Sequence, residues 1–367
     1  MKPAGSRSLY VAAVALALVA APATASYGID RPHTREEPGP YVVPVTAAAR
    51  QFPVTGLPTG AAPRIPYAFA SSADFLGGDW VLRHPDGTVV PLPRLTWSAW
   101  APMGEGAIGM AGTEAGPELQ LVSDGGQVRS HLIQHFGLAV SPDHEIVGWL
   151  DDHGSPHVVE GGGARSFTMP RVGRDVIASV WGAGTCQEQP PEGGGCTVFV
   201  NGRHHVWLST SHGVVDMVRS VLQVSDVSPS GRIAGLVSRR TDRHRACYGV
   251  VRPDGHHVFR SCRYYLDAFS PDGRRVLGER SQARWLSVRR FAILGQDGHV
   301  VRSWTFDAGR RRSLSQLTWE DNHHLLGVLL AHGQWGIVRI GTDGTVEYSG
   351  ATVAATDELA PFSLPLR

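Results

Sequence analysis

Seven glycine-containing turns, each between two short apolar runs, recur at nearly even spacing between Asp79 and Gly350. The turns are Asp86-Gly87, Asp124-Gly125-Gly126, Gly161-Gly162-Gly163, Asn201-Gly202, Asp254-Gly255, Asp297-Gly298 and Asp343-Gly344. Asp-Gly or Asn-Gly between β-prone runs is the strongest short-range signal for a β-hairpin. Successive turns lie about 37 to 53 residues apart, which is typical of the four-stranded blade of a β-propeller.

A strand-turn-strand unit precedes five of these hairpins and carries a glycine at a matching position. These glycines are Gly109, Gly148, Gly235, Gly278 and Gly327. Gly148 and Gly235 are separated by about two repeats, so we expect the unit to be degenerate in the fourth blade, around residues 177–185. The first hairpin is preceded only by residues 65–75, IPYAFASSADF, which leaves rings of six or eight blades open.

Each repeat supplies four short antiparallel strands, and one such sheet cannot bury both of its faces alone. Stacking the sheets around an axis buries the faces and leaves only short edges. The sequence therefore predicts an all-β, seven-bladed β-propeller over residues 59–350, with very little helix.

The first 25 residues have the pattern of a secretory signal peptide. Lys2 and Arg7 precede an apolar stretch of about 13 residues, which is shorter than the roughly 20 that span a membrane, and Ala23 and Ala25 form a cleavage site. We expect cleavage after Ala25 and a secreted protein without a membrane span. Residues 26–58 are expected to form an extended arm, whose segment 41–43 could add a strand to the last blade, and residues 351–367 a tail that is at most partly ordered.

Four cysteines in an exported chain predict two disulfides, for which three connectivities exist. Pairing of sequence neighbours is favoured, so that Cys186 joins Cys196 and Cys247 joins Cys262. Cys247 and Cys262 flank the Asp254-Gly255 turn symmetrically, although Pro253 favours a bulged turn, and a second bulge would then be needed to keep them opposite. Zinc binding is disfavoured because neither pair has CxxC spacing.

Neither the net charge nor the sequence motifs indicate a catalytic site or a nucleic-acid-binding surface. The formal net charge is +1, which predicts no field for nucleic acid or an anionic membrane, and the single lysine, Lys2, among 34 basic residues is typical of the codon usage of a GC-rich genome. We predict no catalytic, cofactor-binding or metal-binding residues, because nucleophile elbows, HExxH motifs and phosphate-binding loops do not occur.

We expect structural roles for the aspartates, tryptophans and histidines that recur in the repeats. Turn aspartates accept hydrogen bonds from their own backbone, and tryptophans that occur once per repeat fit packing between sheets. The aspartates are Asp86, Asp143, Asp254, Asp272, Asp297 and Asp343; the histidine pairs, expected in solvated turns, are His131 and His135, His153 and His157, His204 and His205, His256 and His257, and His323 and His324. Two arginine clusters, Arg239, Arg240, Arg243 and Arg245 and also Arg310, Arg311 and Arg312, are expected to be solvated, with a patch for an acidic partner as the alternative.

The Ser-Pro-Asp-Gly turns carry a family resemblance. FSPDGRRVLGERS (residues 269–281), VSPDHEIVGWL and VSPSGRIAGLV, with the hairpins that follow them, resemble TolB-like and WD-repeat-like β-propellers of exported bacterial proteins, over residues 64–350. The arm is too short for the separate N-terminal α/β domain of TolB, and the Trp-Asp dipeptide of eukaryotic WD repeats is missing. The resemblance implies a ring scaffold that binds other molecules, and it implies no active site.

We therefore expect a non-catalytic, secreted and monomeric propeller that presents loops on one face of the ring to a protein or cell-envelope partner, with no cofactor. The alternative is a propeller lyase or glycoside hydrolase, which would bring two carboxylates or three histidines from different blades together in the central funnel. A third hypothesis is carbohydrate recognition by exposed tryptophans.

Overall fold

The computed structural model describes the chain from residue 48 onward with gaps. The described residues are 48–70, 79–92, 97–113, 116–133, 137–141, 144–151, 153–160, 165–172, 176–181, 186, 195–203, 205–240, 245–280, 287–309, 311–355 and 360–366. The predicted signal peptide and segment 41–43 lie outside the described residues, and the chain from residue 39 to 367 forms one compact unit.

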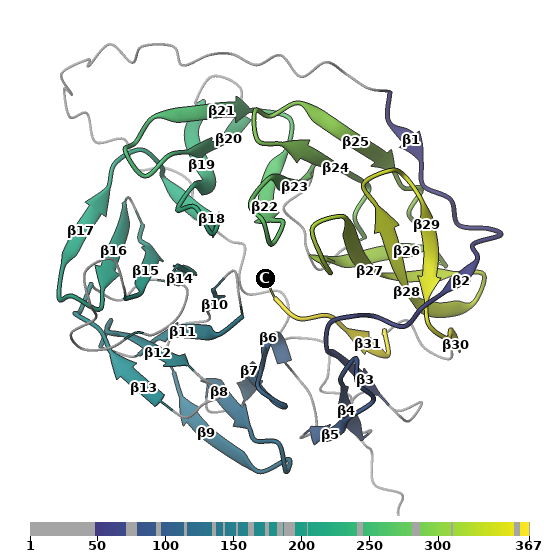
Figure 1. The fold of residues 1–367 in the computed structure, drawn as a ribbon, viewed down its shortest axis with the longest axis horizontal. Helices are drawn as coiled ribbons and strands as arrows, with labels where there is room; N and C mark the ends of the chain where they lie inside the picture. The colour runs from purple at the N-terminus through teal and green to yellow at the C-terminus, as the bar shows by residue number, and fades with distance from the viewer. Residues whose placement is uncertain are drawn as a thin grey trace, which may run out of the picture. The chain divides into compact units, whose positions relative to one another are not determined.

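Seven antiparallel sheets stand around a common axis, so the unit 39–367 is a seven-bladed β-propeller (Figure 1). Its described residues form strands and no α-helix. No helix there is long and apolar enough to cross a membrane. The predicted fold class and blade number are thus confirmed.

Blades 2 to 5 each consist of four consecutive strands, and the first strand lies nearest the axis (Figure 1). Blade 2 contains β6 (Trp97–Met103), β7 (Gly106–Thr113), β8 (Gly116–Val122) and β9 (Val128–Leu132); blade 3 contains β10 (Leu138–Val140), β11 (Ile146–Leu150), β12 (Pro156–Glu160) and β13 (Arg165–Thr168). Blade 4 contains β14 (Val176–Trp181), β15 (Thr197–Asn201), β16 (Val206–Thr210) and β17 (Val215–Val218); blade 5 contains β18 (Gln223–Val227), β19 (Ile233–Arg240), β20 (Arg245–Val251) and β21 (His257–Ser261).

Blades 6 and 7 gain additional strands from the N-terminal arm, which in the structure continues past the expected end at residue 58 to Ala62. Blade 6 contains β22 (Tyr265–Phe269), β23 (Arg275–Glu279), β24 (Arg290–Gly295), β25 (Val300–Thr305) and β1 (Arg50–Gln51), which pairs in parallel with β25. Blade 7 contains β26 (Ser313–Trp319), β27 (His324–Ala331), β28 (Gln334–Gly341), β29 (Val346–Ser349), β30 (Val353–Ala354) and β2 (Thr59–Gly60), which pairs in parallel with β29. The arm therefore extends the outer edges of these two blades.

Blade 1 joins the two ends of the chain. Its strands are β31 (Phe362–Ser363), β3 (Tyr67–Ala70), β4 (Trp80–Arg83) and β5 (Val89–Leu92). In Figure 1 the yellow β31 lies beside the dark blue β3, nearer the axis. The propeller thus extends past the expected end at residue 350, and the segment expected to be a tail supplies the innermost strand of the first blade. This explains why the first repeat has no strand-turn-strand unit of its own.

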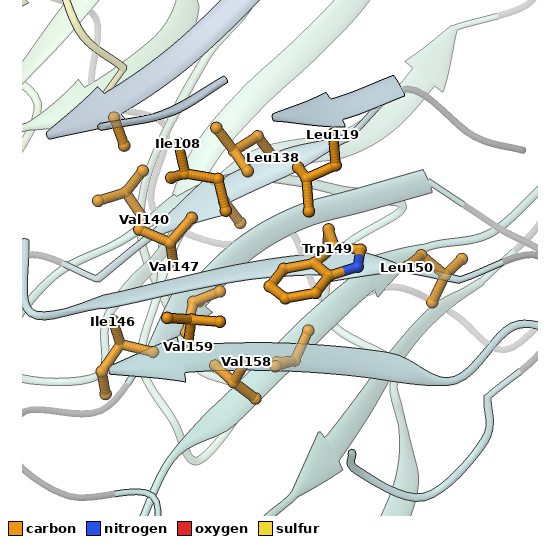
Figure 2. Close-up of a cluster of buried hydrophobic side chains, with 14 of the residues drawn as sticks. Ile108, Leu119, Leu138, Val140, Ile146, Val147, Trp149, Leu150, Val158 and Val159 are labelled. Atoms are coloured by element: carbon orange, nitrogen blue, oxygen red, sulfur yellow. The ribbon is translucent and has the colours of Figure 1, made fainter. Parts of the chain in front are cut away.

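Apolar clusters fill every contact between neighbouring blades. Six clusters of buried side chains cover the seven contacts, because one of them extends across blades 2, 3 and 4. Figure 2 shows Ile108 and Leu119 of blade 2 against Val140, Val147 and Trp149 of blade 3. Each sheet is therefore covered on both faces, which is why most repeats read as nearly continuous apolar runs.

The repeated glycines permit close packing of strands. A Cβ on Gly148 would lie 2.5 Å from a methyl carbon of Val180 in the next blade, and one on Gly109 would lie 2.2 Å from the ring of Trp97. Both distances are shorter than any ordinary carbon contact, so a larger residue would push the strands apart.

Blade 4 differs from the predicted repeat. The Asn201-Gly202 turn joins β15 to β16, the second and third strands, whereas the Asp-Gly turns of the other blades join the third and fourth strands. The corresponding turn of blade 4 contains Gly213, whose φ of 82° is left-handed. The prediction assigned this turn to the wrong pair of strands. Asn-Gly favours a hairpin at any turn that it occupies, so the dipeptide does not show which two strands of the blade it joins.

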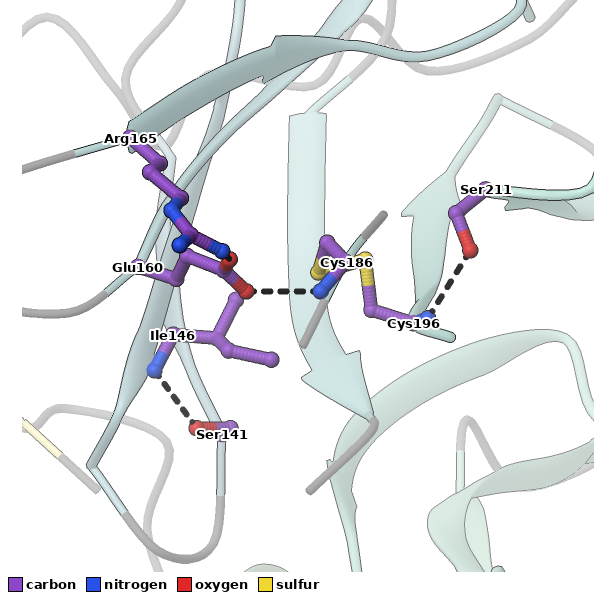
Figure 3. The surroundings of a disulfide bond; sticks show 7 residues. All are labelled: Ser141, Ile146, Glu160, Arg165, Cys186, Cys196 and Ser211. Carbon is purple, nitrogen blue, oxygen red and sulfur yellow. Dashed lines mark hydrogen bonds and ion pairs between the residues drawn. A yellow bond between two sulfur atoms is a disulfide. The ribbon is translucent and has the colours of Figure 1, made fainter. Parts of the chain in front are cut away.

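Two disulfides join Cys186 to Cys196 and Cys247 to Cys262. The first closes a long connection between β14 and β15, and the N–H of Cys186 donates to the buried carboxylate of Glu160 in blade 3 over 2.6 Å (Figure 3). The second lies across β20 and β21, where a bulge between Val250 and Val251 restores the register after the Pro-Asp-Gly turn. These pairs are the ones favoured by sequence proximity, and they indicate an oxidising, non-cytoplasmic environment.

Truncation of Phe362 tests the closure of the ring. Phe362 is 5% exposed and packs between blades 7 and 1, with its ring 5.3 Å from that of Phe69. We expect Phe362→Ala to lower the free energy of unfolding by about 3–5 kcal/mol in urea denaturation, because a cavity remains at the contact. Val89→Ala, at a 53% exposed position of the same blade, is the control and should change stability by less than about 0.5 kcal/mol.

Candidate functional site

The topology gives the ring two chemically different faces. In an antiparallel sheet successive connections alternate between the two ends of the strands. Each blade begins on the face where the previous blade ends, so all seven blades are oriented alike. We call the face with the turns between first and second and between third and fourth strands the turn face. We call the face with the connections between second and third strands and between blades the connection face.

Aspartates of the turn face cap their own turns, as the sequence predicts. The carboxylates of Asp86, Asp254, Asp272, Asp297 and Asp343 each accept a hydrogen bond from the N–H two residues further along. The N–H and hydroxyl of Thr345 hold the pKa of Asp343 below its ordinary value. These carboxylates lie in separate turns of blades 1, 5, 6 and 7, and each is engaged by its own turn. Asp143 lies outside the described residues.

Glu320, Asp321 and His324, at the start of β27, are the one set of metal-binding residue types that the described part of the chain brings together, with ligand atoms within 4.8 Å of one another. The sequence predicts a solvated turn position for His324 and carries no signal that groups the two carboxylates with it. Arg339, which is 5% exposed, donates from Nε and Nη2 to both oxygens of Glu320 at 2.5 and 2.8 Å. Arg64 donates from Nη1 to Asp321 at 3.2 Å.

The guanidinium of Arg339 also binds the N-terminal arm. Its Nη1 and Nη2 donate to the carbonyl oxygens of Ala61 and Ala62 at 3.1 and 2.9 Å, and Nη1 donates to Glu347 at 2.8 Å. The hydrogen bonds that Arg339 donates to Glu320 outweigh the effect of burial and raise the pKa of Arg339. A metal ion at these carboxylates would have to displace a buried guanidinium, so the cluster serves to attach the arm to blade 7.

A hydroxyl, an imidazole and a carboxylate form a chain on blade 3. Thr168 Oγ1 lies 3.2 Å from His157 Nδ1, and His157 Nε2 lies 2.9 Å from Asp151 Oδ2. The order matches that of a hydrolytic triad, but Thr168 is an exposed residue of the outermost strand, and Asp151 also accepts from the N–H groups of His153 and Ser155. Burial alone would raise the pKa of Asp151, but these hydrogen bonds hold it below its ordinary value. The array therefore stabilises the β11–β12 turn, a role of His157 that the sequence analysis missed.

The centre of the ring contains few ionisable groups. On the seven innermost strands the carboxylates are Asp226 and Asp267, which are 8% and 7% exposed, and histidine does not occur. Asp226 accepts from the N–H of Phe269 in the next blade at 2.6 Å and from that of Val227 at 2.8 Å. Its carboxylate joins blades 5 and 6. The C-terminal strand also leads toward the axis, where the N–H of Leu366 donates to the carbonyl of Trp100 at 2.7 Å.

Exposed arginines gather on the connection face between blades 3 and 7. They are Arg171, Arg203, Arg219, Arg239, Arg280, Arg289, Arg311 and Arg312, with the half-buried Arg263 among them. In the described parts of these connections the one exposed carboxylate is Asp307, 4.0 Å from Arg312. The remaining guanidinium groups of this set have no ion-pair partner among the described residues.

The sequence pointed to only part of this face. Arg239, Arg311 and Arg312 belong to the predicted clusters; Arg243 and Arg310 lie outside the described residues, and the side chains of Arg240 and Arg245 are not described. The other arginines come singly from separate connections. No local sequence signal could have grouped them, because only the alternation of connections places them on one face.

Aromatic side chains are not available for stacking on a ligand in the described part of the chain. Trp100, Trp304, Trp319 and Trp335 are at most 3% exposed, and no described tryptophan, tyrosine or phenylalanine is exposed. Trp319 Nε1 donates to the carbonyl of Ala268 in blade 6 at 3.0 Å, so it joins two blades. The expected role in packing is confirmed for these tryptophans; Trp285 lies outside the described residues.

Comparisons with known proteins identify no family for this chain. No protein-family model and no curated protein sequence matches the chain. Among solved structures, YCF48 bound to D1 peptide is similar with a TM-score of 0.47 at 12% identity, covering 80% of this chain and 87% of that one. Hsv2 of Kluyvelomyces marxianus has a TM-score of 0.44 at 8% identity, covering 75% and 92%, and a eukaryotic initiation factor has 0.40 at 12%, covering 84% and 90%. These similarities concern backbone architecture, and they assign no activity or partner.

Glu279, at the end of β23 next to Arg280, predicts a pH dependence of stability. It is 4% exposed, and burial raises its pKa to about 7. Between pH 4.5 and 7 the folded protein holds a proton that the unfolded chain releases, so stability falls as pH rises through this window and then stays constant. We expect Glu279→Gln to gain up to about 3 kcal/mol relative to the parent protein between pH 4.5 and 8, measured by urea denaturation. Glu105→Gln, at an exposed position, should show no such gain, and a pH-independent difference for Glu279→Gln would contradict the assignment.

Proposed function

We propose that this chain is a non-catalytic, secreted scaffold that presents the connection face of its ring to a protein or cell-envelope partner. The observation that carries this proposal is the set of exposed arginines without carboxylate partners on that face. Secretion after cleavage at Ala25, a monomeric state and kinship with TolB-like exported propellers belong to the same proposal. The two disulfides support export, because such bonds persist in oxidising compartments.

The alternative, a propeller lyase or glycoside hydrolase, would depend on Asp226 and Asp267. They lie on inner strands of adjacent blades, which is the placement that such an enzyme requires. Both are buried, and both oxygens of Asp226 accept backbone N–H groups. A general acid or base must reach the substrate within hydrogen-bond distance, so burial disfavours catalysis by either carboxylate, and Asp226 joins blades 5 and 6 instead.

Affinity capture separates the two hypotheses. The mature protein, residues 26–367, is immobilised and exposed to the secreted fraction and the solubilised envelope of the native culture, with its Asp267→Asn variant in parallel. We expect one partner to be retained equally by both proteins. The enzyme hypothesis would be supported by two results together. Neither protein would retain any species above a bare-resin control, and the parent protein would release reducing sugar ends whereas Asp267→Asn would not. The two proteins must first show the same unfolding midpoint.

A further inference from the structure

The arginines of the connection face form an arc along blades 4 to 6. Arg203 lies between β15 and β16, Arg219 between β17 and β18, and Arg239 at the end of β19. Arg263 follows β21, and Arg280 and Arg289 flank the connection from β23 to β24. The arginines of the arc thus lie in consecutive connections of neighbouring blades, and they do not come from one basic segment.

Some arginines of the turn face are paired within the fold. Arg274 lies 3.9 Å from Asp272, Arg165 lies 3.7 Å from Glu160, and Arg339 is bidentate to Glu320. The exposed Arg83, Arg129 and Arg252 of that face have no ion-pair partner among the described residues, and they come from separate blades. On the arc none of the guanidinium groups has an ion-pair partner among the described residues, so its charge is left for an anionic partner to neutralise.

The chemistry of the arc favours an acidic protein segment over other polyanions. Single-stranded nucleic acid is bound by stacking on exposed aromatic rings, and the described residues offer none. A membrane surface needs large apolar side chains that insert, and among the described residues of this face the one exposed large apolar side chain is Leu222, at 38%. Guanidinium groups bind carboxylates through two parallel hydrogen bonds, and a peptide can place carboxylates at the irregular spacing of separate loops.

We propose that the arc from Arg203 to Arg289 is the docking surface for a segment rich in aspartate and glutamate on a partner protein. This inference rests on the proposed scaffold function and specifies the class of its partner. The segment lies across blades 4 to 6 with its carboxylates on the guanidinium groups, and Leu222 offers a small apolar contact beside Arg219.

The test uses the full mature chain and a fluorescein-labelled peptide of alternating glutamate and serine, about 20 residues and therefore at most about 70 Å long. The connection-face variant combines Arg203→Gln, Arg219→Gln and Arg239→Gln. The matched control combines Arg83→Gln, Arg129→Gln and Arg252→Gln, which removes the same charge from exposed positions of the turn face. A third variant, with lysine at positions 203, 219 and 239, keeps the charge and loses the bidentate geometry.

Fluorescence anisotropy should show binding that weakens as salt rises from about 50 to 300 mM. We expect the connection-face variant to lose about tenfold or more in affinity, the lysine variant to lose less, and the control to change less than about twofold. Equal losses in the two glutamine variants would overturn the proposal, because net charge alone would then explain binding. Stronger arginine-dependent binding of polyphosphate or of phosphatidylglycerol vesicles than of the peptide would also overturn it. If no probe binds while affinity capture still retains a partner, the acidic-segment inference fails and the scaffold function stands.

Discussion

Mutual burial of sheet faces between neighbouring blades is the interaction on which the rest of this structure depends. A four-stranded sheet has two apolar faces here, as β27 shows: Leu325 and Leu329 belong to the cluster with blade 6, whereas Leu326 and Val328 belong to the cluster with blade 1. Because side chains alternate along a strand, successive leucines point to opposite neighbours. No blade can then be stable alone, and the ring has to close to cover its first and last faces.

Closure is achieved by exchanging the ends of the chain. The innermost strand of blade 1 comes from the C-terminus, while its other three strands come from the N-terminal part of the propeller. Gln316, at a bulge of β26 in blade 7, has a left-handed φ of 54° and accepts the N–H of Leu364 at 2.8 Å. A side chain in an uncommon backbone conformation thus holds the closing segment against the last blade. The arm is attached to that blade as well, through the guanidinium of Arg339.

The features that depend on residues close in sequence could be predicted from the sequence. The features that depend on pairing between distant segments could not. The Asp-Gly turns, their capping carboxylates and the disulfide between Cys247 and Cys262 follow from residues close in sequence. The pairing of β31 with β3 brings Phe362 next to Phe69, which is almost a whole chain length away in sequence. No sequence pattern in either segment identifies the other as its partner. The exposed arginines are a similar case, since their grouping is a property of ring topology and not of spacing. The role of Asn201 was misassigned because a turn signal does not say which strands of a blade it joins; its side chain instead joins blades 4 and 5 through Val224.

Several arginines of the turn face take part in the fold, whereas those of the arc have no ion-pair partner among the described residues. Codon usage can explain why nearly every basic residue is arginine, and it would act equally on both faces. On the turn face, Arg275 and Arg302 donate to the carbonyl oxygens of Asn322 and Asp343 in blade 7, so their guanidinium groups take part in packing between blades. Among the described residues, the guanidinium groups of the arc make no such hydrogen bond to a neighbouring blade. Since blade packing and turn capping already hold the ring together, the connections are free to carry charge whose partner is another molecule.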